Sequence, residues 1–504
     1  MASTFFGLNI AYSGLQTYQT AVNATSHNIS NVKTEGYSRQ QVDIKAGDAL
    51  RVYSSYGCVG QGVNAVSIER VRDTYYDEKY RNNQSRLGEY EVKDNYMTQM
   101  EDYLNEFSID GFTTEYDSFF AAVDELQKDP TDDTRKNRVI SSLRSMSEYF
   151  NELTLDFKNL QIGVNQEIKN KVEQINTIAE NIATLNKQIN VIEVHGSRAN
   201  DLRDSRDALI DKLSKIVNID VDERELGNGA TTFDVRINGQ ELVDTYNFNR
   251  LAVIGRDDKR NVSDAESLYE VEWENGVTFN EYLDSLGGEL RALIDIRDGN
   301  NDTLEVEPAK TVSTETTFNS DYKGIPYYQT RLNKFATVFA DYVNGLFSKG
   351  VNKDGENPGD IFTVKYSDSP MSAANLAIND YYVEHADKLP TKYPGSDNSD
   401  QAFLNDIMSL RESPIDGFSG ATARYYLESI VSEVSVDTNK AKSFNSNFKT
   451  IAETVQNQRL SVMGTDEDEE AMDLMKFQQA YNLAGHVMSI LNQMYNKLIN
   501  EMGV

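Results

Sequence analysis

Cysteine, histidine and tryptophan are scarce in this sequence of 504 residues, which has one Cys, four His and one Trp. The lone Cys58 excludes an internal disulfide, so packing must stabilise the fold. The four His, at positions 27, 195, 385 and 486, are spread along the chain without a spacing typical of metal ligands. No catalytic motif or phosphate-binding glycine motif accompanies them. We therefore expect no metal site, no cofactor and no catalytic residue.

Long apolar runs are absent as well. No stretch of about 18 apolar residues occurs, so we expect no membrane-spanning helix and no membrane partner. The first basic side chain is Lys33, so the sequence lacks the charged start of a cleavable secretory signal. The protein is expected either to stay in the cytosol or to leave by a route that removes no signal.

Positive charge is in deficit. Acidic residues outnumber basic ones by 80 to 49, which gives a net charge of −31. Such a surface repels a phosphate backbone, so nucleic acid is not an expected partner. Residues 1–62 contain four basic and three acidic side chains. The net acidity therefore belongs to the middle of the chain, where it is typical of a solvated surface.

The opening stretch, residues 1–32, contains no Asp, Glu, Lys or Arg, although 26% of the whole chain is charged. Apolar and small residues recur in it with the 3–4 alternation of a coiled-coil seam, at Leu8, Ala11, Leu15, Tyr18, Val22, Thr25 and Ile29. A helix of this length without ion pairs is only marginally stable by itself. The opening is therefore predicted to be a helix that needs a partner.

A second uncharged seam lies near the other end of the sequence. Its apolar positions follow the same spacing, at Leu474, Phe477, Tyr481, Ala484, Met488, Leu491, Tyr495, Leu498 and Met502. Five consecutive acids, at positions 466–470, precede it and suit a helix start capped by Thr465 or Asp466. An acidic catalytic cluster is the alternative interpretation of this run.

The two seams share a further property, because their outer faces also lack charge. Uncharged faces suit lateral packing between subunits, where a buried charge without a partner would be costly. The seam residues at both ends are therefore predicted to form an assembly interface and not only a private core.

Helical spacing covers most of the sequence between the two ends. It extends over residues 63–216, with a break at Asp129-Pro130 after which Thr131 can cap the restart. Forty residues from Leu153 onward would span about 60 Å of helix. We predict a helical rod domain made of residues 63–216, 323–348 and 420–469.

One short segment of this rod is rich in charge. Asp201, Asp204 and Asp207 alternate there with Arg203 and Arg206. At these spacings we expect ion pairs within one helix in place of a catalytic carboxylate cluster.

At Val217 the period changes from helical to two. Turn signals typical of hairpins, Gly227-Asn228-Gly229, Asn238-Gly239 and Asn275-Gly276, separate the alternating stretches. Residues 217–322 are therefore predicted to be a mostly-β inserted domain, and residues 349–419 a small insertion of unknown fold. The predicted fold class is mainly α: a long coiled-coil or helical-bundle rod formed from both chain ends, with residues 1–62 and 470–504 as its terminal coiled-coil domain.

The opening helix is followed by the run Asn28-Ile29-Ser30-Asn31-Val32-Lys33-Thr34-Glu35-Gly36-Tyr37-Ser38-Arg39-Gln40. Residues 8–40 resemble the N-terminal element of bacterial flagellar axial proteins, and the ending 36–40 resembles the hook-associated protein 1 family in particular. The residues that carry this motif are Asn28, Asn31, Thr34, Gly36, Tyr37 and Arg39. His27 and Lys33 depart from the Asn that is usual there. Residues 202–210 and 468–481 are similar to further segments of the same family.

The resemblance implies a role as well as a fold. It implies a self-assembling structural protein of the bacterial flagellum, at the first junction between hook and filament. The implied partners are further copies of the chain, the hook protein, the second junction protein and a flagellar export chaperone at the C-terminal region. The implied route is the flagellar export channel, and the implied place is extracellular.

Two alternatives stay open from the sequence. One is a sister axial protein, such as the hook protein or the second junction protein. The other is an extracellular acidic hydrolase, which would need two carboxylates about 5–10 Å apart in a cleft.

Overall fold

The computed structural model describes residues 6–51, 58–104, 112–227, 229–301 and 320–501. The chain is mainly helical, which confirms the predicted fold class at this level. It divides into two compact units: Met1–Leu87, Gln174–Arg250 and Phe448–Val504 make unit 1, and Gly88–Glu173 with Leu251–Asn447 make unit 2. Three helices contribute residues to both units: α2 (Thr74–Leu104), α4 (Asp133–Glu193) and α10 (Ala423–Met463). Each unit is described by itself.

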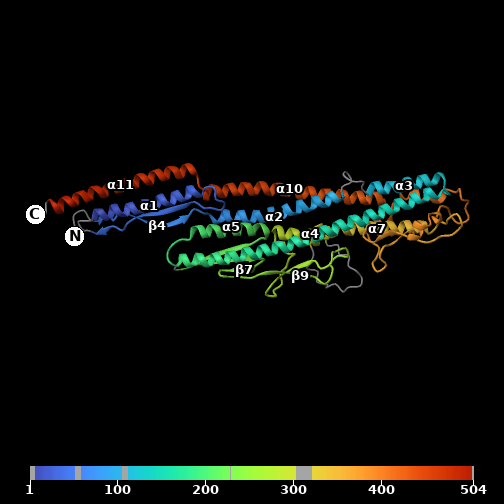
Figure 1. Ribbon diagram of the computed structural model, residues 1–504, viewed down its shortest axis with the longest axis horizontal. Helices are drawn as coiled ribbons and strands as arrows, with labels where there is room; N and C mark the ends of the chain where they lie inside the picture. The colour runs from blue at the N-terminus through green and yellow to red at the C-terminus, as the bar shows by residue number, and fades with distance from the viewer. Residues whose placement is uncertain (1–5, 52–57, 105–111, 228, 302–319, 502–504) are drawn as a thin grey trace. The chain divides into compact units, whose positions relative to one another are not determined.

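Unit 1 contains the two terminal helices, α1 (Phe6–Asn31) and α11 (Glu467–Asn500), which lie side by side (Figure 1). α11 begins at the acidic run, where the Asp466 carboxylate accepts hydrogen bonds from the N–H groups of Asp468 and Glu469 at 2.9 and 3.2 Å. The carboxylates of its first turn face the positive end of the helix dipole. The predicted helix start is therefore confirmed, and Asp466 is its cap.

A ribbon of two antiparallel strands, β1 (Gln40–Ala46) and β4 (Val63–Arg70), contacts α1. In the sequence between β1 and β4 lie the short strands β2 (Leu50–Arg51) and β3 (Cys58–Val59), which pair with each other. The ribbon is fixed to the middle of α1 at Val63, whose carbonyl accepts a hydrogen bond from the Thr17 hydroxyl at 3.1 Å. Gly62, with a φ of +95°, allows this approach, because a Cβ there would lie 2.2 Å from the Ser13 hydroxyl oxygen.

The rest of unit 1 includes helix α5 (Asn200–Ile216) and a four-stranded antiparallel sheet. The sheet order is β5 (Asp220–Gly227), β6 (Ala230–Ile237), β7 (Gln240–Asp244) and β8 (Asn247–Phe248). Every second residue of β6 is buried, as its alternating sequence predicts. Asn238 and Gly239 both have positive φ angles and form the predicted two-residue turn between β6 and β7. Asn228 lies outside the described residues.

Unit 2 is built around α7 (Ile325–Phe347), which starts with a proline in its first turn. Phe335 of α7 is fully buried and stacks on Phe150, Phe339 and Phe418, each with a ring-centroid distance of 5.4 Å. The elements of this unit also include α3 (Phe112–Lys128), α6 (Gly288–Asp298), α8 (Asp380–Glu384) and α9 (Ala402–Ser409). Its strands are the hairpin β9 (Leu251–Gly255) with β10 (Tyr269–Trp273), and the pair β11 (Phe362–Val364) with β12 (Leu376–Ile378).

The described part of the predicted β segment, residues 217–322, contains strands β5 to β10 and also helix α6. Strands β5–β8 belong to unit 1, and β9 and β10 belong to unit 2. Asn275-Gly276 forms a turn after β10, where the Gly276 N–H donates to the Trp273 carbonyl at 2.9 Å. No strand follows this turn between residues 277 and 301, so a complete hairpin was wrongly expected there.

The start of α4 differs from the prediction in one residue. Asp132 caps the helix by accepting a hydrogen bond from the Thr134 N–H at 2.8 Å. Thr131, the predicted cap, instead donates its hydroxyl to the Asp129 carboxylate at 2.7 Å. Asp and Thr both suit a cap, and the carboxylate nearest to the first turn occupies it.

We expect Phe335→Ala to lower the free energy of unfolding of unit 2 by about 3–5 kcal/mol, because it removes a buried ring from a stack of aromatic side chains. Urea unfolding followed by near-ultraviolet circular dichroism measures the loss. Tyr425→Ala is the control, since Tyr425 is 65% exposed and its removal should change stability by less than about 0.5 kcal/mol. Equal effects of the two substitutions would contradict this description of the core.

Candidate assembly interface

Small residues take part in the contact between α1 and α11. The buried residues of α1 are Ala11, Gly14, Thr17, Ala21, Ala24, Thr25 and Asn28. A Cβ at Gly14 would lie 3.8 Å from the Ala484 Cβ, and one at Gly7 would lie 3.4 Å from Leu491. Small side chains at these positions let the two helices approach closely.

The predicted seam of α1 lies beside this line of small residues. Ala11 and Thr25 are buried, whereas the larger seam residues are only half-buried: Leu8, Leu15, Tyr18, Val22 and Ile29. On α11 the predicted positions Leu474, Phe477, Tyr481, Ala484, Met488, Leu491 and Tyr495 are also half-buried, and Leu498 is 50% exposed. Met502 lies outside the described residues. Each large seam residue therefore keeps apolar surface that the pairing of α1 with α11 leaves uncovered.

A second apolar stripe follows the opposite face of α11, and the sequence reasoning missed it. Its members are each at least 48% exposed: Met472, Met475, Leu483, Val487, Ile490 and Met494. Their spacing of mostly three or four residues places them on one face of a helix. This second helical period is present in the sequence, but the prediction rested on the heptad pattern of the seam alone.

The two terminal helices are joined at one end by the amide of Asn28, which is 1% exposed. Its Nδ2 donates to the Gln40 carbonyl and to the Glu470 carboxylate, both at 2.9 Å. Its Oδ1 accepts from the Tyr37 hydroxyl at 2.7 Å and from the Gln40 N–H at 2.9 Å. These four bonds use the whole hydrogen-bonding capacity of an amide side chain. We call this group of four residues the Asn28 clamp.

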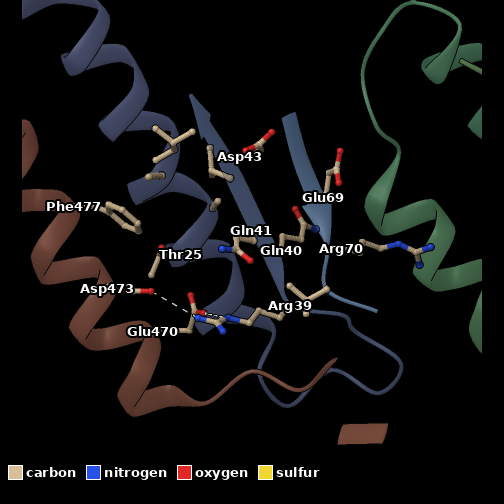
Figure 2. A pocket seen from close by; sticks show the side chains of 15 residues that line it. Thr25, Arg39, Gln40, Gln41, Asp43, Glu69, Arg70, Glu470, Asp473 and Phe477 are labelled. Carbon is tan, nitrogen blue, oxygen red and sulfur yellow. Dashed lines mark hydrogen bonds and ion pairs between the residues drawn. The ribbon is translucent and has the colours of Figure 1, made fainter. Parts of the chain in front are cut away.

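Charges reinforce the Asn28 clamp. Arg39 donates its Nε–H to the Glu470 carboxylate at 2.6 Å, and its Nη2 lies 3.7 Å from Asp473 (Figure 2). Burial and the nearby carboxylates of Asp201, Asp204 and Glu470 raise the pKa of Tyr37 well above its usual value. The Tyr37 hydroxyl therefore keeps its proton and remains a donor to Asn28.

The remaining motif residues form the end of α1 and the turn that follows it. Asn31 donates to the His27 carbonyl at 3.0 Å, and the Thr34 hydroxyl donates to Asn31 at 3.2 Å. Gly36 has a φ of +79°, a conformation that favours glycine. The motif that carries the family resemblance thus ends the first helix and forms the turn after it. This turn brings Tyr37 and Gln40 to Asn28.

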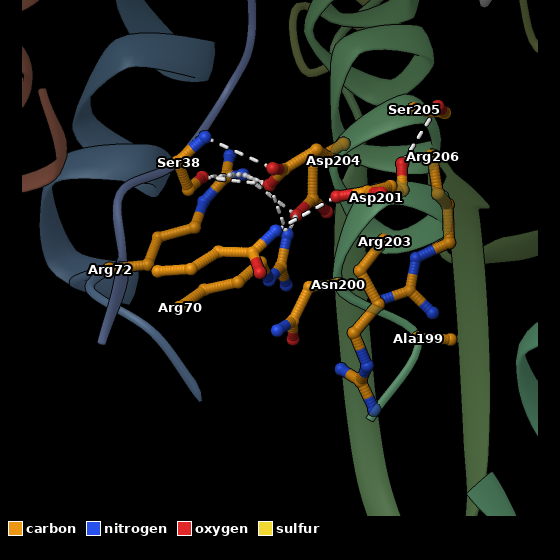
Figure 3. Close-up of polar contacts among 12 residues, drawn as sticks. Ser38, Arg70, Arg72, Ala199, Asn200, Asp201, Arg203, Asp204, Ser205 and Arg206 are labelled. Atoms are coloured by element: carbon orange, nitrogen blue, oxygen red, sulfur yellow. Dashed lines mark hydrogen bonds and ion pairs between the residues drawn. The ribbon is translucent and has the colours of Figure 1, made fainter. Parts of the chain in front are cut away.

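Ion pairs between elements hold α5 in unit 1 (Figure 3). Asp204 accepts hydrogen bonds from the Ser38 N–H at 3.0 Å, the Ser38 hydroxyl at 2.8 Å and Arg70 at 2.7 Å. Asp207 binds Arg70 at 2.8 Å and lies 2.9 Å from Arg72. These contacts connect α5 to Ser38, which lies within the family motif, and to the end of β4.

The predicted ion pairs within α5 are therefore wrong. Arg203 binds Glu193 and Glu223, and Arg206 binds Glu223 and the Asn186 amide. Because α5 is covered on several sides, its charged side chains find partners on neighbouring elements instead of on the next helical turn. Burial alone would raise the pKa of Asp207, but the charges of Arg72, Arg70 and Arg206 outweigh it and hold that pKa well below its usual value.

Within the described ranges, the structure can also be searched for a metal site and for a membrane-spanning helix. No group of three or more His, Cys, Asp or Glu side chains is placed there to hold a metal ion. Among the same residues, no helix combines the length and the apolarity that a bilayer crossing requires.

Comparisons with known proteins identify the family. The model of the "flagellar hook-associated protein FlgK helical domain" matches residues 97–362, which is more than half of the chain. The chain belongs to the FlgK family. Residues 8–37, which include most of α1 and the motif, match a second model, "flagella basal body rod protein".

Curated relatives of this FlgK-family chain carry the name flagellar hook-associated protein 1. The protein from Bacillus subtilis is 27% identical over 525 residues, which cover 100% of this chain and 99% of that protein. The protein from Escherichia coli K12 is 24% identical and covers 98% of this chain and 99% of its own length. The protein from Salmonella typhimurium is 26% identical over 77% of this chain and 65% of its own. The solved FlgK structure from Burkholderia pseudomallei is similar over 57% of this chain and 46% of that one, with a TM-score of 0.45 and 20% identity.

FlgK-family membership settles the class of protein. The family consists of structural hook-associated proteins of the flagellum and is not enzymatic. The acidic run 466–470, for which a catalytic cluster was the alternative, is the capped first turn of α11.

We expect Asn28→Ala to lower the free energy of unfolding of unit 1 by about 2–4 kcal/mol, because it leaves the Tyr37 hydroxyl, the Glu470 carboxylate and the Gln40 backbone without their partner. Urea unfolding followed by far-ultraviolet circular dichroism measures this loss. Asn23→Ala, on the exposed face of the same helix, serves as control and should be neutral or slightly stabilising. A similar result for both substitutions would refute the clamp.

Asp207 should make the stability of unit 1 depend on pH. Its folded pKa lies below the unfolded value of about 3.9, so its contribution is present above about pH 4 and is lost as the pH falls through the folded pKa. At pH 7 we expect Asp207→Asn to cost about 3–5 kcal/mol, because buried guanidinium groups lose a partner.

The difference in unfolding free energy between wild type and Asp207→Asn should therefore shrink below about pH 4. Urea unfolding at a series of pH values measures it. Asp201→Asn is the matched control on the same helix, since the Asp201 side chain is 67% exposed. A difference that stays constant down to pH 2.5 would contradict the assignment.

Proposed function

We propose that this FlgK-family chain forms the first junction zone between the flagellar hook and the filament, and that it assembles there with copies of itself. The observation that carries the proposal is the pair of terminal helices, of which α1 is uncharged and α11 is uncharged between Phe477 and Asn496. Their large seam residues stay half-buried after α1 and α11 have paired, and α11 presents a second apolar stripe to solvent. Apolar surface of this extent on a charged protein is typical of a surface that another protein covers.

The energetics favour subunit contacts over a free monomer. A fully buried Leu, Ile or Met side chain contributes roughly 1.5–3 kcal/mol relative to an exposed one. The six residues of the α11 stripe gain little of this stabilisation while they are exposed. Neighbouring subunits would supply the missing burial, and the absence of charged residues between Phe477 and Asn496 means that no ion needs to be desolvated along that part of α11.

The domain organisation that we infer is the one that the sequence predicts. Residues 1–62 with 470–504 form the terminal coiled-coil domain, and residues 63–216, 323–348 and 420–469 form a helical rod. Residues 217–322 form a mostly-β insertion that faces outward, and residues 349–419 form a second, smaller insertion. In this arrangement the terminal domain builds the inner part of the assembly.

The partners that we infer are the hook protein on one side of the ring and the second junction protein on the other. We further infer export through the flagellar channel to the outside of the cell, with an export chaperone that holds the C-terminal region until then. The exposed stripe of α11 supports this last point, because an uncovered apolar helix needs protection before assembly.

The double substitution Leu483→Lys with Ile490→Lys tests the role of the stripe. In cells that lack the native copy, we expect the variant to be exported but to leave the hook without filament, so that swimming in soft agar is lost. The expected reason is that two charges would be buried in the contact between subunits. The matched control, Asn482→Lys with Gln493→Lys, adds the same charges at exposed polar positions of α11 and should swim normally.

Two measurements separate the possible causes of failure. The amount of variant in the culture medium reports export and chaperone binding, and thermal unfolding of the purified monomer reports the fold. Normal swimming of the Leu483→Lys, Ile490→Lys variant would refute the proposed interface. Deletion of residues 1–40 or 470–504 should give the same defect from a monomer whose unit 2 still folds.

A further inference from the structure

One face of unit 1 is hollowed between α1, β1 and the start of α11 (Figure 2). The groove has a volume of about 570 Å³, which is in the range of ligand-binding clefts. Its lining includes Ala21, Ala24 and Thr25 of α1, six successive residues of β1 and its approach (39–44), and Glu470, Asp473 and Phe477 of α11. Phe477 projects into it from α11. The groove shares Thr25 and Phe477 with the predicted seam, whereas the exposed stripe of α11 lies outside its lining.

The outer edge of β1 is free at the groove. Within the part of the chain that the structure describes, β1 pairs on one side only, with β4, in a two-stranded sheet. The Val71 N–H donates to the Arg39 carbonyl at 2.8 Å, so Arg39 and Val71 are a hydrogen-bonded pair of the ladder. Such pairs alternate along an antiparallel ribbon. The backbone groups of Gln40 and Val42 therefore point away from β4.

Asn28 already acts as a strand neighbour at the first of these positions. Its amide accepts from the Gln40 N–H and donates to the Gln40 carbonyl, both at 2.9 Å, as a residue of a third strand would do. The residues of α1 that line the groove are Ala21, Ala24 and Thr25. Among the described residues, none of the three makes a hydrogen bond to the backbone of Val42, the next outward-facing residue. The Asn28 side chain thus covers the edge of β1 at Gln40, and the groove begins at the next residues of the strand.

The charge of the groove is negative. Arg39 is bound to Glu470, and Arg70 is bound to Asp204 and Asp207 of α5 and points away from the groove in Figure 2. Asp43, Glu69 and Asp473 also line it, and Asp473 lies 3.7 Å from Arg39, so the groove's four carboxylates outnumber the two guanidinium groups of Arg39 and Arg70. Asp43 has Lys45 at 3.1 Å, but both side chains are exposed, so this pair neutralises little.

From these observations we infer that the groove binds an extended segment of a partner protein, which adds to β1 as a third strand and carries basic side chains alternating with apolar ones. Backbone hydrogen bonds to Val42 provide the strand pairing. The apolar side chains of the segment contact Ala21, Ala24 and Phe477, and its basic side chains approach Asp43 and Asp473. An uncapped strand edge presents unpaired N–H and C=O groups, which can pair with another chain.

The test uses the full-length monomeric chain and a fluorescein-labelled octapeptide of alternating valine and lysine, with binding measured by fluorescence anisotropy at low salt. We expect saturable binding, and about tenfold weaker binding of the same peptide with glutamate in place of lysine. Val42→Pro, which removes the outward N–H, should also weaken binding by about tenfold or more, whereas Val42→Ala, which keeps it, should not. Asp43→Asn with Asp473→Asn should remove the preference for lysine over glutamate.

Two further peptides keep the test valid if Val42→Pro unfolds unit 1. Each carries N-methyl groups on alternate amides, one on the odd positions and the other on the even positions. Strand addition uses only one edge of the peptide, so one of the two should bind like the parent and the other should lose binding. Equal binding of both methylated peptides, or no saturable binding of the lysine peptide up to 1 mM, would overturn the inference. These measurements use the monomer, so they stand apart from the test of assembly.

Discussion

A single amide group ties unit 1 together. Asn28 lies at the end of the first helix, and its four hydrogen bonds reach the turn after that helix, the first strand and the first turn of the last helix. An aspartate could not donate to Gln40, and an apolar residue would remove the partner of the Tyr37 hydroxyl and of both Gln40 backbone groups, while Glu470 would keep its bond to Arg39. The small-residue contact between α1 and α11 depends on this fixed end, because neither helix has ion pairs along the contact that would set its position.

The outline of the fold could be predicted from the sequence because it rests on local signals. The hydrophobic periods located the helices and the strands, the acidic run marked the start of α11, and Asn238-Gly239 marked a hairpin turn. The motif after the first helix pointed to the family before any contact was known. These features depend on neighbours within a few residues, and local chemistry decides them.

The contacts between distant segments could not be predicted in the same way. Asp204 and Asp207 were assigned to arginines on their own helix, yet they bind Arg70 and Arg72, which lie more than 130 residues earlier. The seam of α1 was placed mostly on its large residues, yet Gly14 and Asn28, which the seam did not include, also contact α11. A heptad pattern reports which residues are apolar, but close packing of two helices selects small residues. The free edge of β1 could be found only once the hydrogen bonds of Gln40 were known.

The bond between Asn28 and Glu470 also affects the order in which the chain can fold. It joins residues that are 442 positions apart in the chain. A ribosome adds roughly 5–20 residues per second, so α1 exists for roughly 20–90 s before α11 has been made. During that interval α1 can pack on β1 and β4 but not on α11, and the two helices can pair only after synthesis is almost complete. Formation of the terminal pair is therefore a late step in folding, and the long loop that it closes makes it a slow one.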